Sequence, residues 1–448
     1  MAPMAFLEAR NAQEALTLAA KVHAGAAKAA RMPAHARAKV LDALAASIRS
    51  EREAWAKLLV EEVAKPLKDA RREADRAAFT VSWSAGEALR LGGHWMPLDA
   101  EPSGENRLCF VRRVSRGPGI FISPFNFPLN LSLHKVAPAI AAGVPFVLKG
   151  PPQAPQCARK LGEALSAAGW PDECGVVVSC PNDAAEALVK DERFATLSFT
   201  GSAGVGWKLK TAAGRKHVVL ELGGAACVVV GADADLPFAA ARCVAGGFAY
   251  SGQTCISVQR ILVEESVYEE FTRLLLANVD ELKVGEPSAE ATDVGPLIDE
   301  NAAKRVDEWV AEAVAGGGKL LRGGPRKGRV VPPTVVEKPP ESCRLVKDEV
   351  FGPVVTVEPV RSLAEGVAKA GSGVWGLQAG VFTKDIDAVF SAWNDLQVAG
   401  LIVNDVPTYR SDLMPYGGSK QSGIGREGVR YAIEELTEPR ALILTHHP

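Results

Sequence analysis

The sequence predicts an α/β fold with mostly parallel sheets, and two observations lead to this prediction. From Pro118 onward, short apolar runs alternate with amphipathic stretches of helical spacing. Short apolar strands separated by amphipathic helices are typical of a parallel sheet that is covered on both faces. The chain is also long, at 448 residues, which leaves room for two or three domains with their own cores.

The first quarter of the chain is expected to be helical. Apolar residues recur with helical spacing over 11–31, and again from Val40 to Ile48. The run Ser50-Glu-Arg-Glu53 has the pattern of a capping box that opens a third helix, which Pro66 interrupts. Residues 67–90 are charged and rich in alanine, which predicts a further helix. Glycine and proline predict a loop over 92–104, and a strand is expected at 107–116.

Two series of strands and helices follow, separated by Gly223-Gly224. In the first series, strands are expected at 119–123, 145–149, 175–179, 195–199 and 217–222, and helices at 129–142, 158–168 and 183–190. In the second series, strands are expected at 226–230, 256–263, 354–359, 378–382 and 400–403, and helices at 236–250, 265–281 and 298–315. Residues 316–333 predict a loop or hairpin, and 440–445 alternate like an edge strand.

The amino-acid composition argues against several classes of function. Lys plus Arg number 51 and Asp plus Glu 53, so the net charge of -2 predicts no nucleic-acid partner. The chain contains no apolar run of transmembrane length and no signal-peptide pattern at its start, so a cytoplasmic protein without a membrane partner is expected. The eight cysteines are irregularly spaced without a CxxC pair, which predicts reduced thiols and no metal site.

Three residues are candidates for catalysis. Cys255 follows a small polar turn and precedes a β-branched run, where a thiol can face a cleft, although an isolated cysteine is more often a small buried apolar residue. Asn126 lies between Pro124 and Pro128, where a rigidly held amide can donate to an oxyanion or only satisfy its own turn. Glu221 ends an apolar strand, where a carboxylate can be a general base or a cap.

Other segments are candidates for nucleotide binding. Residues 199–206, FTGSAGVG, follow a predicted strand and open a helix, so their backbone amides could approach a pyrophosphate, or they could form an ordinary turn. Gly316-Gly-Gly-Lys-Leu320 lacks the Ser or Thr of a P-loop, and Gly117-Pro-Gly119 precedes a strand, so both are interpreted as turns. Lys149 and Glu349 could meet a ribose, or could be solvated charges at strand ends.

Taken together, these segments resemble the aldehyde dehydrogenase superfamily. Its motifs occur in order and at similar spacing over residues 115–440: PFNFP at 124–128, LKGPP at 148–152, FTGSAGVG at 199–206, ELGG at 221–224, GQTC at 252–255, EVFGP at 349–353 and PYGGSKQSGIGREG at 415–428. The resemblance implies a Rossmann-like NAD(P)-binding domain (1–98 and 118–224), an α/β catalytic domain (225–436) and a small β oligomerisation arm (99–117 and 437–448), in a homodimer or homotetramer.

The resemblance also implies roles for individual residues. Cys255 would be the nucleophile, Glu221 the base that activates water, and Asn126 the oxyanion donor. Ribose hydroxyls would be held by Lys149 and Glu349, and the pyrophosphate by Gly201 and Ser202. The remaining implied contacts to NAD or NADP are Phe125, Val205, Gly206, Leu222 and Phe351, of which Phe351 would pack near the nicotinamide. An aldehyde would then be oxidised to the acid through a thiohemiacetal and a thioester on cysteine.

Some positions depart from the family pattern. Gly150 replaces a usual proline after Lys149, and Phe125 replaces a frequent tryptophan. Pro152 stands where NAD-preferring members often carry a glutamate that disfavours a 2'-phosphate, so both NAD and NADP stay open.

The substrate implied by the resemblance is a small aldehyde. The segment Thr408–Pro415 resembles a branch that handles lactaldehyde-like, phosphorylated or sulfonated aldehydes. Arg410 in this segment could bind an anionic group of the substrate, or could be a surface arginine paired within its loop. Phe127 is expected to border the substrate.

Three alternatives carry different expectations. A CoA-acylating relative would usually lack the glutamate found at Glu221. A catalytically silent structural relative would not need Asn126, Glu221 and Cys255 together. A thiol or serine hydrolase would need a histidine, for which only His134 is a candidate.

Overall fold

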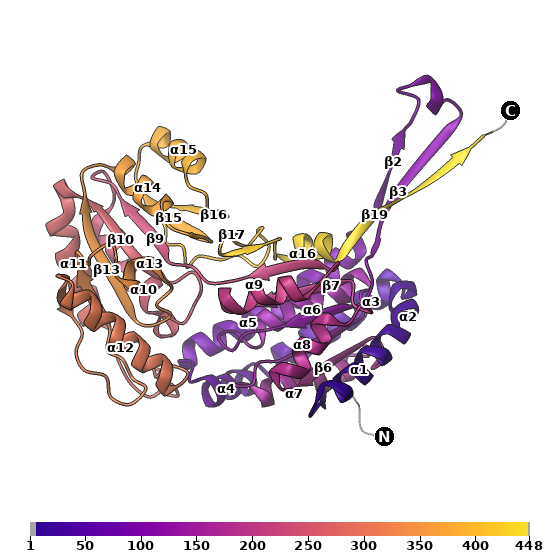
Figure 1. Cartoon of the computed structure of the whole chain (residues 1–448), viewed down its shortest axis with the longest axis horizontal. Helices are drawn as coiled ribbons and strands as arrows, with labels where there is room; N and C mark the ends of the chain where they lie inside the picture. Colours follow the sequence, from indigo (N-terminus) through magenta and orange to yellow (C-terminus); the bar gives the residue numbers. More distant parts are fainter. Residues whose placement is uncertain (1–5, 447–448) are drawn as a thin grey trace.

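The computed structural model describes residues 6–446 and confirms the predicted α/β fold. The chain forms two lobes, each built on a seven-stranded sheet, and a narrow three-stranded arm that projects from the body (Figure 1). None of the helices in the described range is long and apolar enough to cross a membrane. All eight cysteines are free thiols, as their irregular spacing predicts.

The N-terminal quarter is helical, as predicted, but one helix boundary differs. The helices are α1 (Ala12–Ala24), α2 (Ala26–Arg31), α3 (Ala34–Ser50), α4 (Arg52–Val63) and α5 (Leu67–Arg90). Ser50 is the last residue of α3, and its hydroxyl donates to the Ser47 carbonyl at 2.9 Å. The predicted capping box is therefore wrong, because α3 continues through Ser50 and α4 begins without a side-chain cap.

The first sheet has the strand order β1-β6-β5-β4-β7-β8-β18. Its strands are β1 (Phe6–Glu8), β4 (Gly119–Ile122), β5 (Phe146–Lys149), β6 (Gly175–Ser179), β7 (Thr196–Thr200), β8 (His217–Glu221) and β18 (Gly423–Ile424). All neighbours pair in parallel except β18, which runs antiparallel to β8. Strands β1 and β18 were not predicted from the sequence. The helices of this part are α6 (Asn130–Ala142), α7 (Pro155–Ala167), α8 (Asn182–Lys190) and α9 (Ala203–Ala212).

The order of the first sheet places its functional loops. The chain leaves β4 toward β5 and β6 on one side, and β7 then pairs on the other side of β4. Open parallel sheets bind ligands at such a reversal of strand order, beyond the carboxyl ends of the strands. The PFNFP loop follows β4, and the FTGSAGVG turn follows β7, so both lie at this reversal.

The second sheet has the order β11-β12-β13-β10-β9-β15-β16. Its strands are β9 (Ala226–Val230), β10 (Val258–Glu264), β11 (Lys319–Arg322), β12 (Thr334–Glu337), β13 (Val354–Val360), β15 (Gln378–Phe382) and β16 (Gly400–Val403). Only β11 is antiparallel, and it pairs with β12 across the predicted hairpin region. The helices are α10 (Leu236–Phe248), α11 (Tyr268–Asp280), α12 (Glu300–Ala315), α13 (Arg344–Lys347), α14 (Leu363–Gly371) and α15 (Ile386–Asp395). Helix α16 (Val429–Leu436) instead packs on α5 and α6 of the first lobe. The short strands β14 (Trp375–Gly376) and β17 (Ser419–Lys420) pair separately.

The arm is an antiparallel sheet in the order β19-β3-β2, with β2 (Gly93–Pro97), β3 (Arg107–Ser115) and β19 (Thr437–Thr445). Residues 93–97, which the sequence grouped with the cofactor-binding domain, pair with β3 in this arm. Residues 447–448 of the expected arm lie outside the described residues. The arm carries exposed apolar side chains on all three strands, including Trp95, Phe110 and Leu442.

Candidate active site

A turn with left-handed backbone conformation precedes Cys255. After α10, residues Tyr250, Ser251 and Gly252 all have positive φ angles, of 47°, 55° and 71°. A Cβ atom on Gly252 would overlap the carbonyl oxygen of Gly352, so this position needs glycine. The two non-glycine residues are held by side-chain hydrogen bonds, from Tyr250 Oη to the Val63 carbonyl (2.9 Å) and from Ser251 Oγ to the Gly295 carbonyl (2.8 Å). These bonds offset the cost of left-handed backbone at non-glycine residues.

Cys255 lines a cavity of about 240 Å³. The walls come from α5, the PFNFP loop, the turn before Cys255 and the segment 408–416, and include Arg72, Arg76, Phe127, Thr254, Arg410 and Tyr416. The Cys255 Sγ atom lies 3.0 Å from Tyr416 Oη. Burial raises the pKa of the Cys255 thiol to about 12, with further increases from Glu349 and Glu221, while Tyr416 and Arg410 oppose the rise. The thiol is therefore protonated at neutral pH in the absence of ligands.

Asn126 is held from both its side chain and its backbone. It is only 4% exposed, and its Nδ2 atom donates to the Gln253 carbonyl at 3.1 Å. The Asn126 carbonyl accepts from Lys65 Nζ at 2.6 Å. A side-chain amide carries two hydrogens, so one remains free to donate a second hydrogen bond.

Lys65 and Glu73 form a buried ion pair under this loop, and sequence reasoning missed both. Glu73 Oε1 accepts from the backbone amides of Leu129 (3.0 Å) and Asn130 (3.1 Å). The Lys65 ammonium lies 3.7 Å from the ring centroid of Phe127. In sequence these two charges look like residues of a solvated helix face, and only their tertiary burial distinguishes them.

Glu221 ends β8 and is 3% exposed. Neither of its carboxylate oxygens has a hydrogen-bond partner among the described residues. Burial raises the pKa of Glu221 well above its usual value, and the neighbouring Glu427 raises it further. A Cβ atom on Gly417 would lie 2.8 Å from Glu221 Oε1, so a glycine here leaves room beside the carboxyl group.

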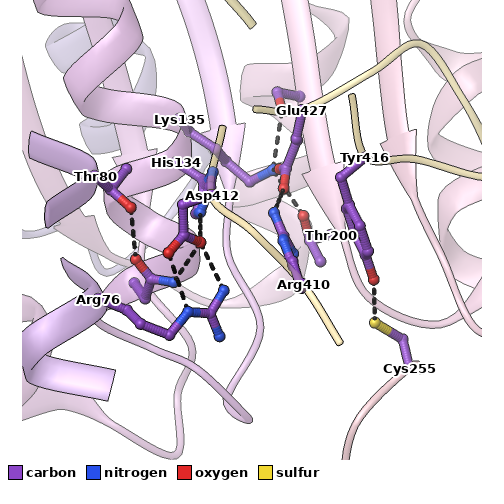
Figure 2. A network of polar contacts seen from close by, with 12 residues as sticks. Arg76, Thr80, His134, Lys135, Thr200, Cys255, Arg410, Asp412, Tyr416 and Glu427 are labelled. Carbon is purple, nitrogen blue, oxygen red and sulfur yellow. Dashed lines mark hydrogen bonds and ion pairs between the residues drawn. The ribbon is translucent and has the colours of Figure 1, made fainter. Parts of the chain in front are cut away.

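Glu427 is a second buried carboxyl group, and its pKa is shifted in the opposite direction. It contacts Lys135 Nζ at 2.9 Å and Arg410 Nη2 at 3.1 Å (Figure 2). Burial alone would raise the pKa of Glu427, but these two cations lower it to about 2. Two neighbouring carboxyl groups therefore have pKa values pushed apart, which is typical of acid–base sites.

The expected pyrophosphate turn has the geometry that such a site requires. Strand β7 ends at Thr200, and α9 begins at Ala203 after Ser202, whose side chain makes no capping hydrogen bond. The first amides of α9 thus remain available to an anion at the helix N-terminus. A Cβ atom on Gly206 would overlap the Leu222 side chain, so this glycine permits close packing of α9 on β8, while Val205 is exposed. These features fit a dinucleotide.

The remaining expected cofactor residues lie near the carboxyl ends of the strands of the first sheet. Lys149 ends β5 and is buried, which lowers its pKa. Glu349 Oε1 accepts from the Gly224 amide at 3.0 Å, and burial raises the pKa of Glu349 to about 7. The rings of Phe351 and Phe125 meet edge to face with centroids 6.0 Å apart.

Arg410 lines the cavity but is not a free surface arginine. It pairs with Glu427, and its guanidinium carbon lies 3.6 Å from the centroid of the Tyr416 ring. Its Nε atom is buried without a hydrogen-bond partner among the described residues. Both Arg72 and Arg76, which sequence reasoning missed, face the cavity from α5. The side chain of Arg72 is 69% exposed and lies 3.5 Å from Asp69, and Arg76 pairs with Asp412 at 2.6 Å.

His134, the candidate for a hydrolase, lies elsewhere in this network. It is buried in α6, and its Nε2 atom lies 2.8 Å from Asp412 (Figure 2). The hydrogen-bond partner of the Cys255 thiol is Tyr416 rather than a histidine. The structure therefore does not bring together the pair that a cysteine hydrolase requires.

Comparison with known proteins shows the family to which this chain belongs. The sequence pattern of the aldehyde dehydrogenase family matches residues 2–442. The 3-sulfolactaldehyde dehydrogenase of Priestia aryabhattai is 41% identical over 409 residues, which cover 91% of this chain and 86% of that protein. The structure of aldehyde dehydrogenase 21 from Physcomitrella patens, in complex with the reaction product succinate, has a TM-score of 0.95 and 41% identity over 97% of this chain and 91% of that chain. The structure of glyceraldehyde-3-phosphate dehydrogenase GapN from Methanocaldococcus jannaschii, complexed with NADP, has a TM-score of 0.93 and 35% identity over 98% of this chain and 96% of that chain. The chain therefore belongs to the aldehyde dehydrogenase family of aldehyde-oxidising oxidoreductases.

Proposed function

We propose that this protein oxidises a small anionic aldehyde to the carboxylic acid, with NAD⁺ or NADP⁺ as acceptor and Cys255 as nucleophile. The observation that carries the proposal is the position of the Cys255 thiol in a small cavity with arginines on its walls. The side chain of Asn126 is hydrogen-bonded to the carbonyl of Gln253, which lies two residues before Cys255. The unpaired carboxyl group of Glu221 is close enough to affect the pKa of the thiol.

The residues have distinct tasks in this reaction. The Cys255 thiol first loses its proton to solvent. The thiolate then forms a bond to the aldehyde carbon, and the carbonyl electrons move to oxygen, where the free hydrogen of Asn126 Nδ2 stabilises the charge. When bound at the α9 N-terminus, NAD(P)⁺ supplies the hydride acceptor. Oxidation leaves a thioester on Cys255. Glu221 then takes a proton from a water whose oxygen attacks the thioester carbon, and cleavage of the C–S bond releases the acid and the thiolate.

Hydrolysis, rather than transfer of the acyl group to CoA, is supported by Glu221. Its carboxyl group is buried without a hydrogen-bond partner among the described residues, so no neighbouring donor competes with an incoming water. Burial raises the pKa of Glu221, which makes its carboxylate a stronger base than an ordinary carboxylate and suits a general base. Adding CoA to the reaction should leave the rate of NAD(P)H formation unchanged and form no acyl-CoA. Formation of acyl-CoA would favour the acylating alternative instead.

An anionic substrate is supported by the charges of the cavity. Arg72 has a mostly exposed side chain, and Arg410 has an unpaired Nε donor, so both can bind an anionic group. The volume of about 240 Å³ corresponds to roughly eight water molecules, which suits a small molecule. The relative named a 3-sulfolactaldehyde dehydrogenase and the neighbour that holds succinate are consistent with this class.

Initial rates with a panel of aldehydes test the substrate and the cofactor together. We expect sulfolactaldehyde and succinic semialdehyde to give higher kcat/KM than neutral lactaldehyde, each assayed with NAD⁺ and NADP⁺. Replacing Arg72 by Gln should lower kcat/KM for the anionic aldehydes about 10- to 100-fold, which corresponds to one hydrogen bond to a charged group. The neutral aldehyde serves as the control. Equal losses for charged and neutral aldehydes would contradict an anion-binding role.

A homo-oligomer is supported by the arm. Exposed apolar side chains occur on β2, β3 and β19, and burying them against a second copy would remove them from water. Light scattering should give the mass of a dimer or tetramer, and charged substitutions at Leu442 and Leu444 should shift the mass toward the monomer. A monomeric wild-type protein would contradict this part of the proposal.

A further inference from the structure

We propose that Tyr416 is a further catalytic residue, whose phenol hydroxyl donates a hydrogen bond to the Cys255 thiolate and stabilises it for attack. The inference rests on the proposed function, in which Cys255 is the nucleophile. It adds a group that touches the reacting sulfur atom before the aldehyde arrives.

The geometry of the pair is direct. Tyr416 Oη lies 3.0 Å from Cys255 Sγ, and the phenol points at the sulfur (Figure 2). Tyr416 is buried, and its backbone is fixed by reciprocal hydrogen bonds with Glu427, at 3.0 Å from the Tyr416 amide and 2.6 Å from the Glu427 amide. The hydroxyl is thus held in place by the fold and does not need substrate to orient it.

The direction of the hydrogen bond follows from the charge on sulfur. While Cys255 is a thiol, either atom can donate, but a thiolate has no hydrogen and must accept. Burial raises the pKa of Tyr416 well above its usual value, and the neighbouring Cys255 raises it further, so the phenol keeps its proton. Ionisation of Cys255 therefore turns an ordinary hydrogen bond into a charge-assisted one, which is stronger.

Arg410 strengthens Tyr416 as a hydrogen-bond donor by its contact with the ring. Its guanidinium carbon lies 3.6 Å from the centroid of the Tyr416 ring, and its Nη2 atom is fixed by Glu427. A cation over the ring face attracts the π electrons and makes the phenol a better hydrogen-bond donor. Arg410 is thus a positioning residue that acts through Tyr416.

The other charged groups around the thiol explain why such a donor is needed. Burial raises the pKa of Cys255 to about 12, and the carboxylates of Glu349 and Glu221 act in the same direction. From α5, the cavity is also faced by Asp69, Arg72, Glu73 and Arg76, whose charges oppose one another. Among the described residues, Tyr416 is the hydrogen-bond donor that contacts Sγ directly.

The test measures the thiol itself and needs no aldehyde. Alkylation of Cys255 by iodoacetamide is followed against pH, and the modified peptide is quantified by mass spectrometry so that the other cysteines do not contribute. We expect Tyr416→Phe to raise the pKa of Cys255 by about one unit, a tenfold loss of thiolate at a given pH. The more basic thiolate reacts about threefold faster, so alkylation near neutral pH falls only about threefold, and the shift of the titration is the decisive quantity.

Tyr409→Phe is the matched control, because Tyr409 is an exposed phenol in the same loop. It should leave the Cys255 titration unchanged, and melting curves with a cofactor titration check that both variants fold. An unchanged or lower pKa in Tyr416→Phe would overturn the proposal, since the phenol would then only hold the neutral thiol.

A double-variant comparison tests the role of Arg410. Arg410→Met should raise the pKa of Cys255 in the native background, and by less in the Tyr416→Phe background. Equal effects in both backgrounds would show that Arg410 does not act through the phenol and would overturn that part.

Failure of this inference is distinguishable from failure of the proposed function. If Cys255→Ser retained NAD(P)H formation, the nucleophile itself would be wrong, whatever the Cys255 titration showed. If Cys255→Ser is inactive and Tyr416→Phe leaves the pKa of Cys255 unchanged, only the role of Tyr416 is wrong. In turnover, Tyr416→Phe should move the acidic limb of the pH profile of hydride transfer upward by the same amount as the thiol titration, with KM unchanged.

Discussion

Replacing Asn126 by Ala tests the oxyanion site most directly. In the structure one hydrogen of the Asn126 amide is used by the Gln253 carbonyl at 3.1 Å, which leaves one hydrogen for an oxyanion. The variant removes that donor, while the thiol, the base and the α9 N-terminus keep their positions. The affected step is the attack on the aldehyde and the oxidation that follows.

The magnitude follows from the count of donors. Loss of one preorganised oxyanion donor typically costs a factor of about 10² to 10³ in rate, or about 2.7–4 kcal/mol. The variant also leaves the buried Gln253 carbonyl without its partner, which costs about 1–3 kcal/mol of stability. The second cost affects folding and the first affects the reaction, so the two can be measured separately.

Rapid mixing with NAD(P)⁺ and aldehyde gives the rate of the first NAD(P)H formed. We expect this rate to fall about 10² to 10³-fold in Asn126→Ala, while the dissociation constant for NAD(P)H, measured by fluorescence, stays within about twofold. A first-turnover rate within about threefold of wild type, in a folded variant, would refute the oxyanion role.

Three further predictions follow from the buried charges. Glu221→Gln should retain the first turnover of NAD(P)H and lose about 10²- to 10⁴-fold in steady-state rate, because a general base is missing only from hydrolysis; equal losses in both phases would contradict this. Lys65→Met should lower the free energy of unfolding in urea by about 3–5 kcal/mol, since it leaves Glu73 buried and unpaired, and adding Glu73→Gln should recover much of the loss; no recovery would place the cost elsewhere. The carboxylate of Glu427 has a folded pKa lowered to about 2, below its unfolded value of about 4.3, so its contribution to stability is complete above the unfolded value and is lost as pH falls toward 2. The free energy of unfolding should therefore fall less between about pH 5 and pH 3 in Glu427→Gln than in wild type, and parallel curves would exclude this contribution.

Local sequence patterns predict much of the fold. Most strands of both sheets, and the helices up to residue 315, were predicted because each is a short apolar or amphipathic run bounded by glycine, proline or polar residues. Strands β1, β12 and β18 and helices α13 to α16 were not predicted. Asn126 and Gly201 follow strands β4 and β7 of the first sheet, and Glu221 is the last residue of β8 in the same sheet. Parallel strands bring such residues to a common edge without further information.

Contacts between distant segments could not be predicted in this way. Strand β18 pairs with β8 across some 200 residues, and its two residues are too few to show a periodic pattern. The charges of Lys65 and Glu73 resemble those of a solvated helix until tertiary packing buries them. Arg410 likewise pairs with Glu427, seventeen residues away, through a loop whose course depends on the rest of the fold.

In the proposed reaction the aldehyde carbon becomes bonded to Cys255, and water activated at Glu221 releases the acid. Intact-protein and peptide mass spectrometry of Glu221→Gln, mixed with NAD(P)⁺ and substrate, tests it most directly. We expect one acyl group per subunit, located on the Cys255 peptide, together with one NAD(P)H. An acyl group on another of the eight cysteines, or full turnover without any adduct, would contradict it.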